Sequence, residues 1–205
     1  MHFEVLGEQN KQIFTRLSAL PNFYLAGGTA LALQIGHRVS VDFDLFNDIA
    51  ISPQLFDSVS QVFHGLSLQP VVNNSGELTM LANGIKVTFL HYPFPVVQDL
   101  INYEGLKLLA VTEIAATKAY TIGRRGSFKD YVDLYFILRQ KHCQLTDIIS
   151  IACEKYKQAL NSRLFLEQLV YLKDVPEDKL IFLKESISRE QIQIFFETEI
   201  SKMKL

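Results

Sequence analysis

"FYLAGGTALALQIGHRVSVDFDLF", residues 23–46, places a strand signal, a glycine turn and a helix signal in direct succession. The first four residues, "FYLA", are apolar and stop at Gly27 and Gly28, which is typical of a strand that meets a tight turn. "TALALQIG", residues 29–36, is rich in good helix formers, and Gly36 is a suitable helix terminator. The stretch therefore predicts a strand, a turn and a short helix.

The polar end of this stretch, "SVDFDLF" (40–46), alternates in polarity and predicts a second strand. Its apolar positions are expected on one face: Val41, Phe43 and Leu45. Asp42 and Asp44 would share the other face, about 6–7 Å apart, which suits two carboxylates that bind divalent cations. The glycine turn and the helix N-terminus would offer N–H groups to a phosphate, and Thr29 would add a hydroxyl. The alternative is that both acids simply line the solvent face of a half-exposed strand.

The rest of the chain predicts an α+β fold in two parts. The first part adds helices at 8–19 and 53–64 and strands at 66–72, 77–82 and 85–92, with Asn83-Gly84 as a hairpin signal. From about residue 106 onward the patterns are helical, at 112–123, 128–141, 145–156, 161–172 and 188–203. We therefore expect an α/β core over 1–105 and a helical domain over 106–205.

Composition indicates a cytoplasmic protein. The net charge of −2 gives no global basic field for nucleic acid, although a local basic patch stays possible. Cys143 and Cys153 form no paired motif and are typical of ordinary intracellular thiols. The N-terminus lacks a signal-peptide pattern, and no stretch approaches the roughly 18–20 apolar residues of a membrane span, so no membrane partner is expected.

The combined motifs resemble the AbiEii/AbiGii toxin family of the DNA polymerase β-like nucleotidyltransferase superfamily. The resemblance starts with "GGTALAL" (27–33) and "GHRVSVDFDLF" (36–46). It continues at Glu113 and Lys118 and at "RGSFKDYVDL" (125–134), and covers roughly residues 21–140. The resemblance implies a polymerase β-like mixed sheet flanked by helices, followed by a helical bundle.

The resemblance also implies an activity, the transfer of a nucleoside monophosphate from an NTP to an acceptor hydroxyl. Asp42 and Asp44 would hold Mg²⁺, and Gly27, Gly28 and Ser40 would surround the triphosphate. Lys118 and Asp130 match a lysine and an acid that related toxins need for activity. The implied acceptor is RNA, at the 3′ end of tRNA, and the biological role would be that of a toxin with an antitoxin partner. The helical domain over 106–205 would complete the active-site cleft.

Each of these residues also has a plainer structural interpretation. Lys118 lies on or beside an apolar helical stripe, where a lysine often extends to the protein surface. Asp130 would cap a helix that starts after Ser127, or it would orient Lys118 or an arginine. His37-Arg38 would either approach the nucleotide or pack the loop. The basic cluster formed by Arg124, Arg125 and Lys129 would meet phosphate or RNA, or it would be a solvated face.

One element of the superfamily pattern is missing. Many polymerase β-like enzymes carry a third carboxylate on a neighbouring strand, but "IKVTFLHY" (85–92) offers Lys86 and Thr88 on the corresponding face. Glu77 is the nearby substitute. Two further functions therefore stay open: a nucleotide-binding interaction protein with a degenerate site, and a nucleotidyltransferase that modifies a small molecule, as antibiotic-modifying enzymes do.

Overall fold

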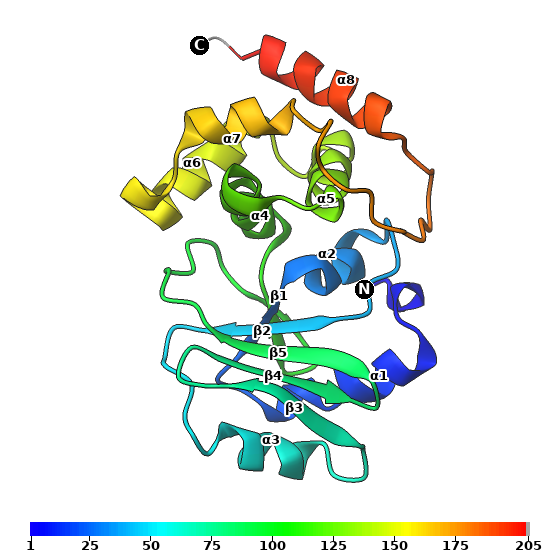
Figure 1. Ribbon diagram of the computed structural model, residues 1–205, viewed down its shortest axis with the longest axis vertical. Coiled ribbons are helices and arrows are strands. Elements are labelled where there is room, and N and C mark those ends of the chain that lie inside the picture. Colours follow the sequence, from blue (N-terminus) through cyan, green and yellow to red (C-terminus); the bar gives the residue numbers. More distant parts are fainter. Residues whose placement is uncertain (204–205) are drawn as a thin grey trace. The chain divides into compact units, whose positions relative to one another are not determined.

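The computed structural model describes residues 1–203, and the chain divides into two compact units (Figure 1). The first unit comprises Met1–Pro95 and Asp99–Leu109, and the second comprises Val96–Gln98 and Ala110–Leu205. Each unit has its own apolar core. Within the described residues, no helix combines the length and the apolar character that a membrane crossing requires.

A seven-stranded mixed sheet forms the centre of the first unit, in the order β3-β4-β5-β2-β1-β7-β6. The strands are β1 Tyr24–Ala26, β2 Phe43–Asn47, β3 Leu68–Asn73, β4 Glu77–Ala82, β5 Ile85–His91, β6 Ile101–Tyr103 and β7 Leu106–Leu108. Neighbours pair antiparallel except β2 with β5 and β1 with β7, which are parallel. The predicted hairpin is confirmed, because β4 and β5 meet around Asn83 and Gly84, which both have positive φ.

Three α-helices accompany this sheet in the described part of the first unit: α1 Glu8–Phe14, α2 Gly27–Ile35 and α3 Leu55–Val62. Figure 1 shows α2 beside β1 and β2, and α3 beside β3. Helix α2 ends as predicted at Gly36, whose φ of 63° is the left-handed conformation that glycine adopts at low cost. It begins at Gly27 itself, so the glycine pair belongs to the first turn of the helix.

The segment before β2 differs from the prediction. The expected strand at 40–46 starts only at Phe43, and Val41 is 55% exposed instead of buried beside Phe43 and Leu45. Contacts made elsewhere in the chain explain this. The Asn10 side-chain amide donates to the Val41 carbonyl over 2.7 Å, and the Ser40 N–H donates to the Val5 carbonyl. These bonds hold residues 40–41 as a loop and leave them unavailable for strand pairing.

A second difference lies at the expected boundary after residue 105. Strands β6 and β7 form a hairpin there, and β7 adds to the sheet beside β1. Glu104 and Gly105 form its turn with φ of 49° and 84°. The sheet therefore extends to about Leu109, and the all-helical pattern begins at Ala110.

The second unit is helical, as predicted. Its helices are α4 Val111–Arg125, α5 Phe128–Arg139, α6 Leu145–Tyr156, α7 Ser162–Leu169 and α8 Arg189–Ser201. Helix α4 packs against α5, α6 and α7, while α8 packs against α5 and α7. The fully buried Lys155 ammonium lies 2.6 Å from the Glu113 carboxylate, which also accepts from the N–H groups of Val97 and Gln98. This contact explains why residues 96–98 belong to the helical unit.

Candidate active site

The acid pair lies at the start of β2 in the first unit. Phe43 and Leu45 are buried, whereas Asp42 and Asp44 between them are half-buried, so the predicted division of faces is confirmed for these four residues. Asp42 lies just before the strand, and its Oδ2 atom is 3.5 Å from the Lys86 Nζ atom of β5. Both partners are substantially exposed, so this ion pair contributes at most about 1 kcal/mol to stability.

The glycine pair fits closely against this site. Gly27 has a φ of 67°, and a Cβ atom at this position would overlap the Asp44 carboxylate. A Cβ atom at Gly28 would lie 2.6 Å from the Nη2 atom of Arg38. The N-terminus of α2 therefore approaches the acid-bearing strand more closely than any residue with a side chain would allow.

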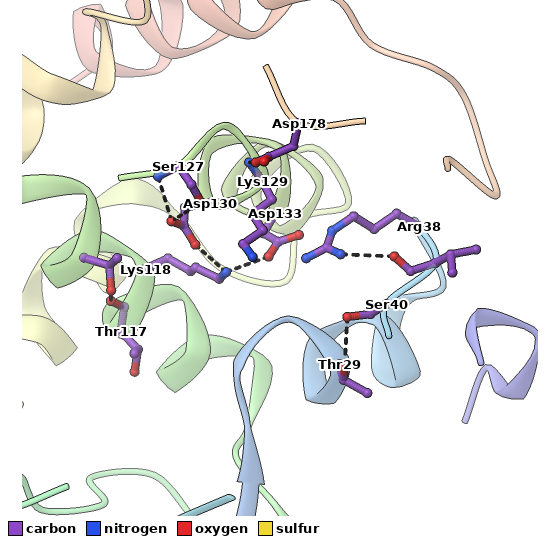
Figure 2. Close-up of polar contacts among 12 residues, drawn as sticks. Thr29, Arg38, Ser40, Thr117, Lys118, Ser127, Lys129, Asp130, Asp133 and Asp178 are labelled. Atoms are coloured by element: carbon purple, nitrogen blue, oxygen red, sulfur yellow. Dashed lines mark hydrogen bonds and ion pairs between the residues drawn. The ribbon is translucent and has the colours of Figure 1, made fainter. Parts of the chain in front are cut away.

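The loop between α2 and β2 is fixed by buried hydroxyls. The hydroxyl oxygens of Thr29 and Ser40 are 2.7 Å apart (Figure 2). The Thr29 hydroxyl also donates to the Asp42 carbonyl. The Arg38 guanidinium donates to the Val39 carbonyl over 3.1 Å. These contacts agree with the loop-packing alternative for Arg38, and they also hold its guanidinium beside Gly28. Predicted site residues thus come together in the first unit: Gly27, Gly28, Thr29, Arg38, Ser40, Asp42 and Asp44.

The other two predicted residues form a cluster in the helical unit. The Lys118 ammonium lies 2.6 Å from the Asp130 carboxylate and 2.7 Å from that of Asp133 (Figure 2). All three residues are buried, so Lys118 does not extend to solvent. Asp133 follows Asp130 by one helical turn, which places both carboxylates on the same face of α5.

Asp130 fills both of the roles that the sequence left open. Its Oδ2 atom accepts from the N–H and the hydroxyl of Ser127, which completes a capping box at the start of α5. Its Oδ1 atom accepts from the Lys118 ammonium. Burial by itself raises the pKa of Asp130, but the Lys118 charge and the hydrogen bonds from Lys118 and Ser127 outweigh it, so the pKa lies below its usual value.

One member of the basic cluster, Arg124, packs against neighbouring groups of its own unit. The Arg124 guanidinium lies 4.4 Å from the centre of the Tyr120 ring and donates to the Ala159 carbonyl. Arg125 and Lys129 are exposed, and the Lys129 N–H donates to the Asp178 carboxylate. Arg124 therefore joins α4 to the segment after α6, whereas the exposed side chains of Arg125 and Lys129 fit the solvated-face interpretation.

Strand β5, which pairs with β2, offers no carboxylate opposite Asp44, as the sequence indicated. Thr88 of β5 lies directly opposite Asp44 of β2. Within residues 1–203, no group of three or more His, Cys, Asp or Glu side chains is arranged to hold a metal ion. Two half-exposed carboxylates beside a side-chain-free helix N-terminus nevertheless suit a hard divalent cation that takes its other ligands from water and phosphate.

Some partners of these residues were not anticipated from the sequence. Lys86 was expected on the face of Asp42, but its ion pair with Asp42 was not. The partnership of Glu113 with Lys155 joins residues 42 positions apart. No local signal indicates that contact. Asp133 carries such a signal, because its spacing of three from Asp130 places it on the same helical face.

Comparisons with known proteins relate the sequence around these residues to a family of nucleotidyltransferases. Residues 12–76 match the family model "Nucleotidyl transferase AbiEii toxin, Type IV TA system", and this range includes the glycine pair and both acids. The chain is 32% identical over 188 residues to the uncharacterized protein aq_aa25 of Aquifex aeolicus, covering 88% of this chain and 87% of the relative.

Solved structures share the fold across the length of the chain. A Helicobacter pylori protein provisionally assigned as a nucleotidyltransferase superposes with a TM-score of 0.63 at 19% identity, covering 96% of this chain and 97% of that one. JHP933 from Helicobacter pylori gives a TM-score of 0.54 at 16% identity, with the same coverage. The α+β architecture predicted from the sequence is therefore confirmed as nucleotidyltransferase-like. The match of residues 12–76 to the family model identifies an AbiEii-type nucleotidyltransferase domain in this chain, which is therefore a nucleotidyltransferase.

Proposed function

We propose that the chain transfers a nucleoside monophosphate from an NTP to a hydroxyl of an RNA acceptor in a magnesium-dependent reaction. One observation carries the proposal: Gly27 brings the N-terminus of α2 against the Asp44 carboxylate, with Asp42 two residues away. Helix N-termini bind phosphate, and paired carboxylates bind hard cations. A magnesium triphosphate needs both kinds of group in one place.

The residues have separate tasks in this proposal. Asp42 and Asp44 would hold Mg²⁺, which supplies positive charge to the triphosphate and to the developing charge on the leaving group. The N–H groups at Gly27 and Gly28 would bind phosphate oxygens, and Arg38 would add charge beside them. The exposed ion pair between Lys86 and Asp42 is weak, so a bound cation would displace Lys86 at little cost.

We further propose that Lys118 and Asp130 serve the same reaction, with Lys118 supporting the pyrophosphate that leaves. A buried ion pair rarely stabilises a fold more than apolar residues of similar volume do. Removing the two charges from water costs several kcal/mol each, and their mutual attraction offsets only about that amount. Lys118 is held between two carboxylates at 2.6 and 2.7 Å. Because three buried charges at the start of α5 bring little stability, their presence favours a functional role for the cluster.

The family description supports the biological part of the proposal. The matched model describes a toxin of a toxin–antitoxin system, so we propose that this chain is a toxin with an antitoxin partner. RNA is the acceptor class we propose, with the 3′ hydroxyl of tRNA as the group that attacks the α-phosphorus.

The test is transfer of label from each α-labelled NTP to total tRNA, with and without Mg²⁺. We expect magnesium-dependent labelling that is lost in Asp42→Ala, Asp44→Ala and Lys118→Met. Asp57→Asn, which removes an exposed charge from α3 of the same unit as the acid pair, is the control and should label normally. Labelling that survives in both aspartate variants would refute the proposed site. Magnesium-dependent NTP binding without transfer to RNA, protein or small molecules would instead show a binding protein with a degenerate site.

A further inference from the structure

A row of hydrogen-bonded side chains starts beside Asp44 and crosses three strands. Thr88 of β5 is directly opposite Asp44, and Thr79 of β4 is directly opposite Thr88. The hydroxyl oxygens of the two threonines are 3.1 Å apart, and the Thr79 hydroxyl donates to the Glu77 carboxylate. Residues opposite one another in a sheet share a face, as do residues two apart in one strand, so all four side chains lie on the same face.

The direction of this row follows from the number of protons. The Glu77 carboxylate only accepts, and each threonine hydroxyl has one proton to donate. The Thr79 hydroxyl is placed to donate to Thr88 as well as to Glu77, but its single proton serves one of them at a time. When it is directed to Glu77, the Thr88 hydroxyl can rotate to donate its own proton to Thr79. The row therefore runs from Thr88 through Thr79 to Glu77, and the Thr88 oxygen keeps its capacity to accept a further proton.

The strand spacing argues against a direct metal-binding role for Glu77. Neighbouring strands are about 4.8 Å apart, so the backbone of Thr79, whose hydroxyl contacts the Glu77 carboxylate, lies two strands and roughly 10 Å from that of Asp44. Paired catalytic metals lie only about 4 Å apart, and a third ligand must reach the same ions. Thr88 is one strand away from Asp44 and half-buried, so it is the member of the row that an acceptor can reach.

We propose that this row replaces the absent third carboxylate as the base of the transfer reaction, with Thr88 touching the acceptor hydroxyl. This inference rests on the proposed function. The acceptor hydroxyl gives its proton to Thr88, the Thr88 proton passes to Thr79, and the Thr79 proton passes to the Glu77 carboxylate, which becomes a carboxylic acid. The acceptor oxygen forms a bond to the α-phosphorus, and the bond from the α-phosphorus to the bridging oxygen breaks, with its electron pair leaving on pyrophosphate. Thr79 and Glu77 are thus positioning residues that act through Thr88.

The charges around the row are few. Lys86 shares the face of the row on β5, whereas His91 lies on the opposite face. Asp44 belongs to β2 with Asp42 just before it, and β3 contributes no titratable side chain. If the row had only a structural role, it would simply provide a hydrogen-bond acceptor for the buried Thr79 hydroxyl. In that case Glu77→Gln, which keeps an acceptor for this hydroxyl, would leave the rate unchanged or lower it by a factor that is independent of pH.

The experiment measures kcat and KM for labelling of the tRNA acceptor between pH 6.5 and 9 in the full chain. We expect Thr88→Val and Glu77→Gln to lower kcat by about 10²-fold at pH 6.5 with little change in KM, as for the loss of a general base. Hydroxide partly replaces the lost base, so the deficit of Glu77→Gln should shrink to about tenfold or less at pH 9. Thr88→Ser keeps the hydroxyl and should retain most of the activity.

A compensating variant makes the test independent of folding. Thr88→Asp combined with Glu77→Gln places a carboxylate beside Asp44 and should recover at least tenfold in kcat over Glu77→Gln alone. The relay would be overturned if the loss of kcat in Glu77→Gln were the same at every pH. It would also be overturned if the double variant, shown to be folded by thermal unfolding, did not recover activity. Asp44→Ala separates the two proposals. If Asp44→Ala abolishes transfer while Glu77→Gln behaves like wild type at every pH, the relay alone is refuted. If Asp44→Ala is active, the proposed function is refuted.

Discussion

Replacement of Lys118 by methionine tests the buried charge cluster most directly. Methionine matches the length of the lysine stem but lacks its charge, so Asp130 and Asp133 lose an ammonium at 2.6 and 2.7 Å. Breaking a buried ion pair by removing one partner costs about 3–5 kcal/mol, because a buried charge is left uncompensated. At about 2–4 °C per kcal/mol for a chain of this size, Tm should fall by roughly 6–20 °C.

The second unit offers a matched control for this variant. Lys155 and Glu113 form another buried lysine–carboxylate pair at 2.6 Å, and neither residue belongs to the proposed site. Lys155→Met should therefore lower Tm by a comparable amount, measured by thermal unfolding at pH 7. Well below both transitions, Lys155→Met should transfer label to tRNA at close to the normal rate, whereas Lys118→Met should not.

Two results would contradict this reasoning. A Tm of Lys118→Met within about 2 °C of wild type, less than the shift expected for 1 kcal/mol, would show that the ammonium is not buried between two carboxylates in solution. Equal loss of transfer in Lys118→Met and Lys155→Met would show that the Lys118 substitution acts through stability alone.

Three further predictions concern single groups. Folding lowers the pKa of Asp130 from 3.8, so its ionised form stabilises the fold above that pH, and this stabilisation is lost as the pH falls through the folded pKa. The difference in unfolding free energy between wild type and Asp130→Asn, measured by urea unfolding, should therefore be constant above about pH 5 and shrink below pH 3.8. Gly27→Ala should cost about 1–2 kcal/mol for the left-handed backbone, and it should lower labelling by about 10²-fold because the methyl group displaces the Asp44 carboxylate. Burial, with Asp147 nearby, raises the pKa of the Cys143 thiol to about 12, so iodoacetamide at pH 8 should modify exposed Cys153 much faster, as read by peptide mass spectrometry.

The features that could be predicted from the sequence are those that neighbouring residues determine. Gly36 ends α2, the Asn83-Gly84 turn joins β4 to β5, and Ser127 with Asp130 starts α5. Each of these depends on a backbone conformation or on a hydrogen bond within three or four residues. The alternation of Asp42 and Asp44 with apolar residues belongs to the same class, because it needs only a strand with one buried face.

The features that could not be predicted depend on contacts between distant parts of the chain. Val41 continues the alternating pattern of β2, yet a bond from Asn10 keeps it out of the strand. The hairpin of β6 and β7 has only three residues in each strand, which is too short for a periodic pattern to be distinctive. The ion pair of Lys155 with Glu113 spans two helices, and either residue alone is typical of an exposed helical face.

Asp130 shows why a structural and a functional interpretation of one residue need not exclude each other. A carboxylate has two oxygens, and here Oδ2 caps α5 through Ser127 while Oδ1 binds Lys118. The cap fixes the first turn of α5, so the position of Lys118 depends on where that helix begins. Asn at position 130 would keep an oxygen for the cap but lose the charge opposite Lys118, whereas Ser127→Ala would weaken the cap and keep the ion pair. If Lys118 serves the reaction through its charge, Asp130→Asn should lower transfer much more than Ser127→Ala, because only Asp130→Asn removes a carboxylate charge beside the ammonium.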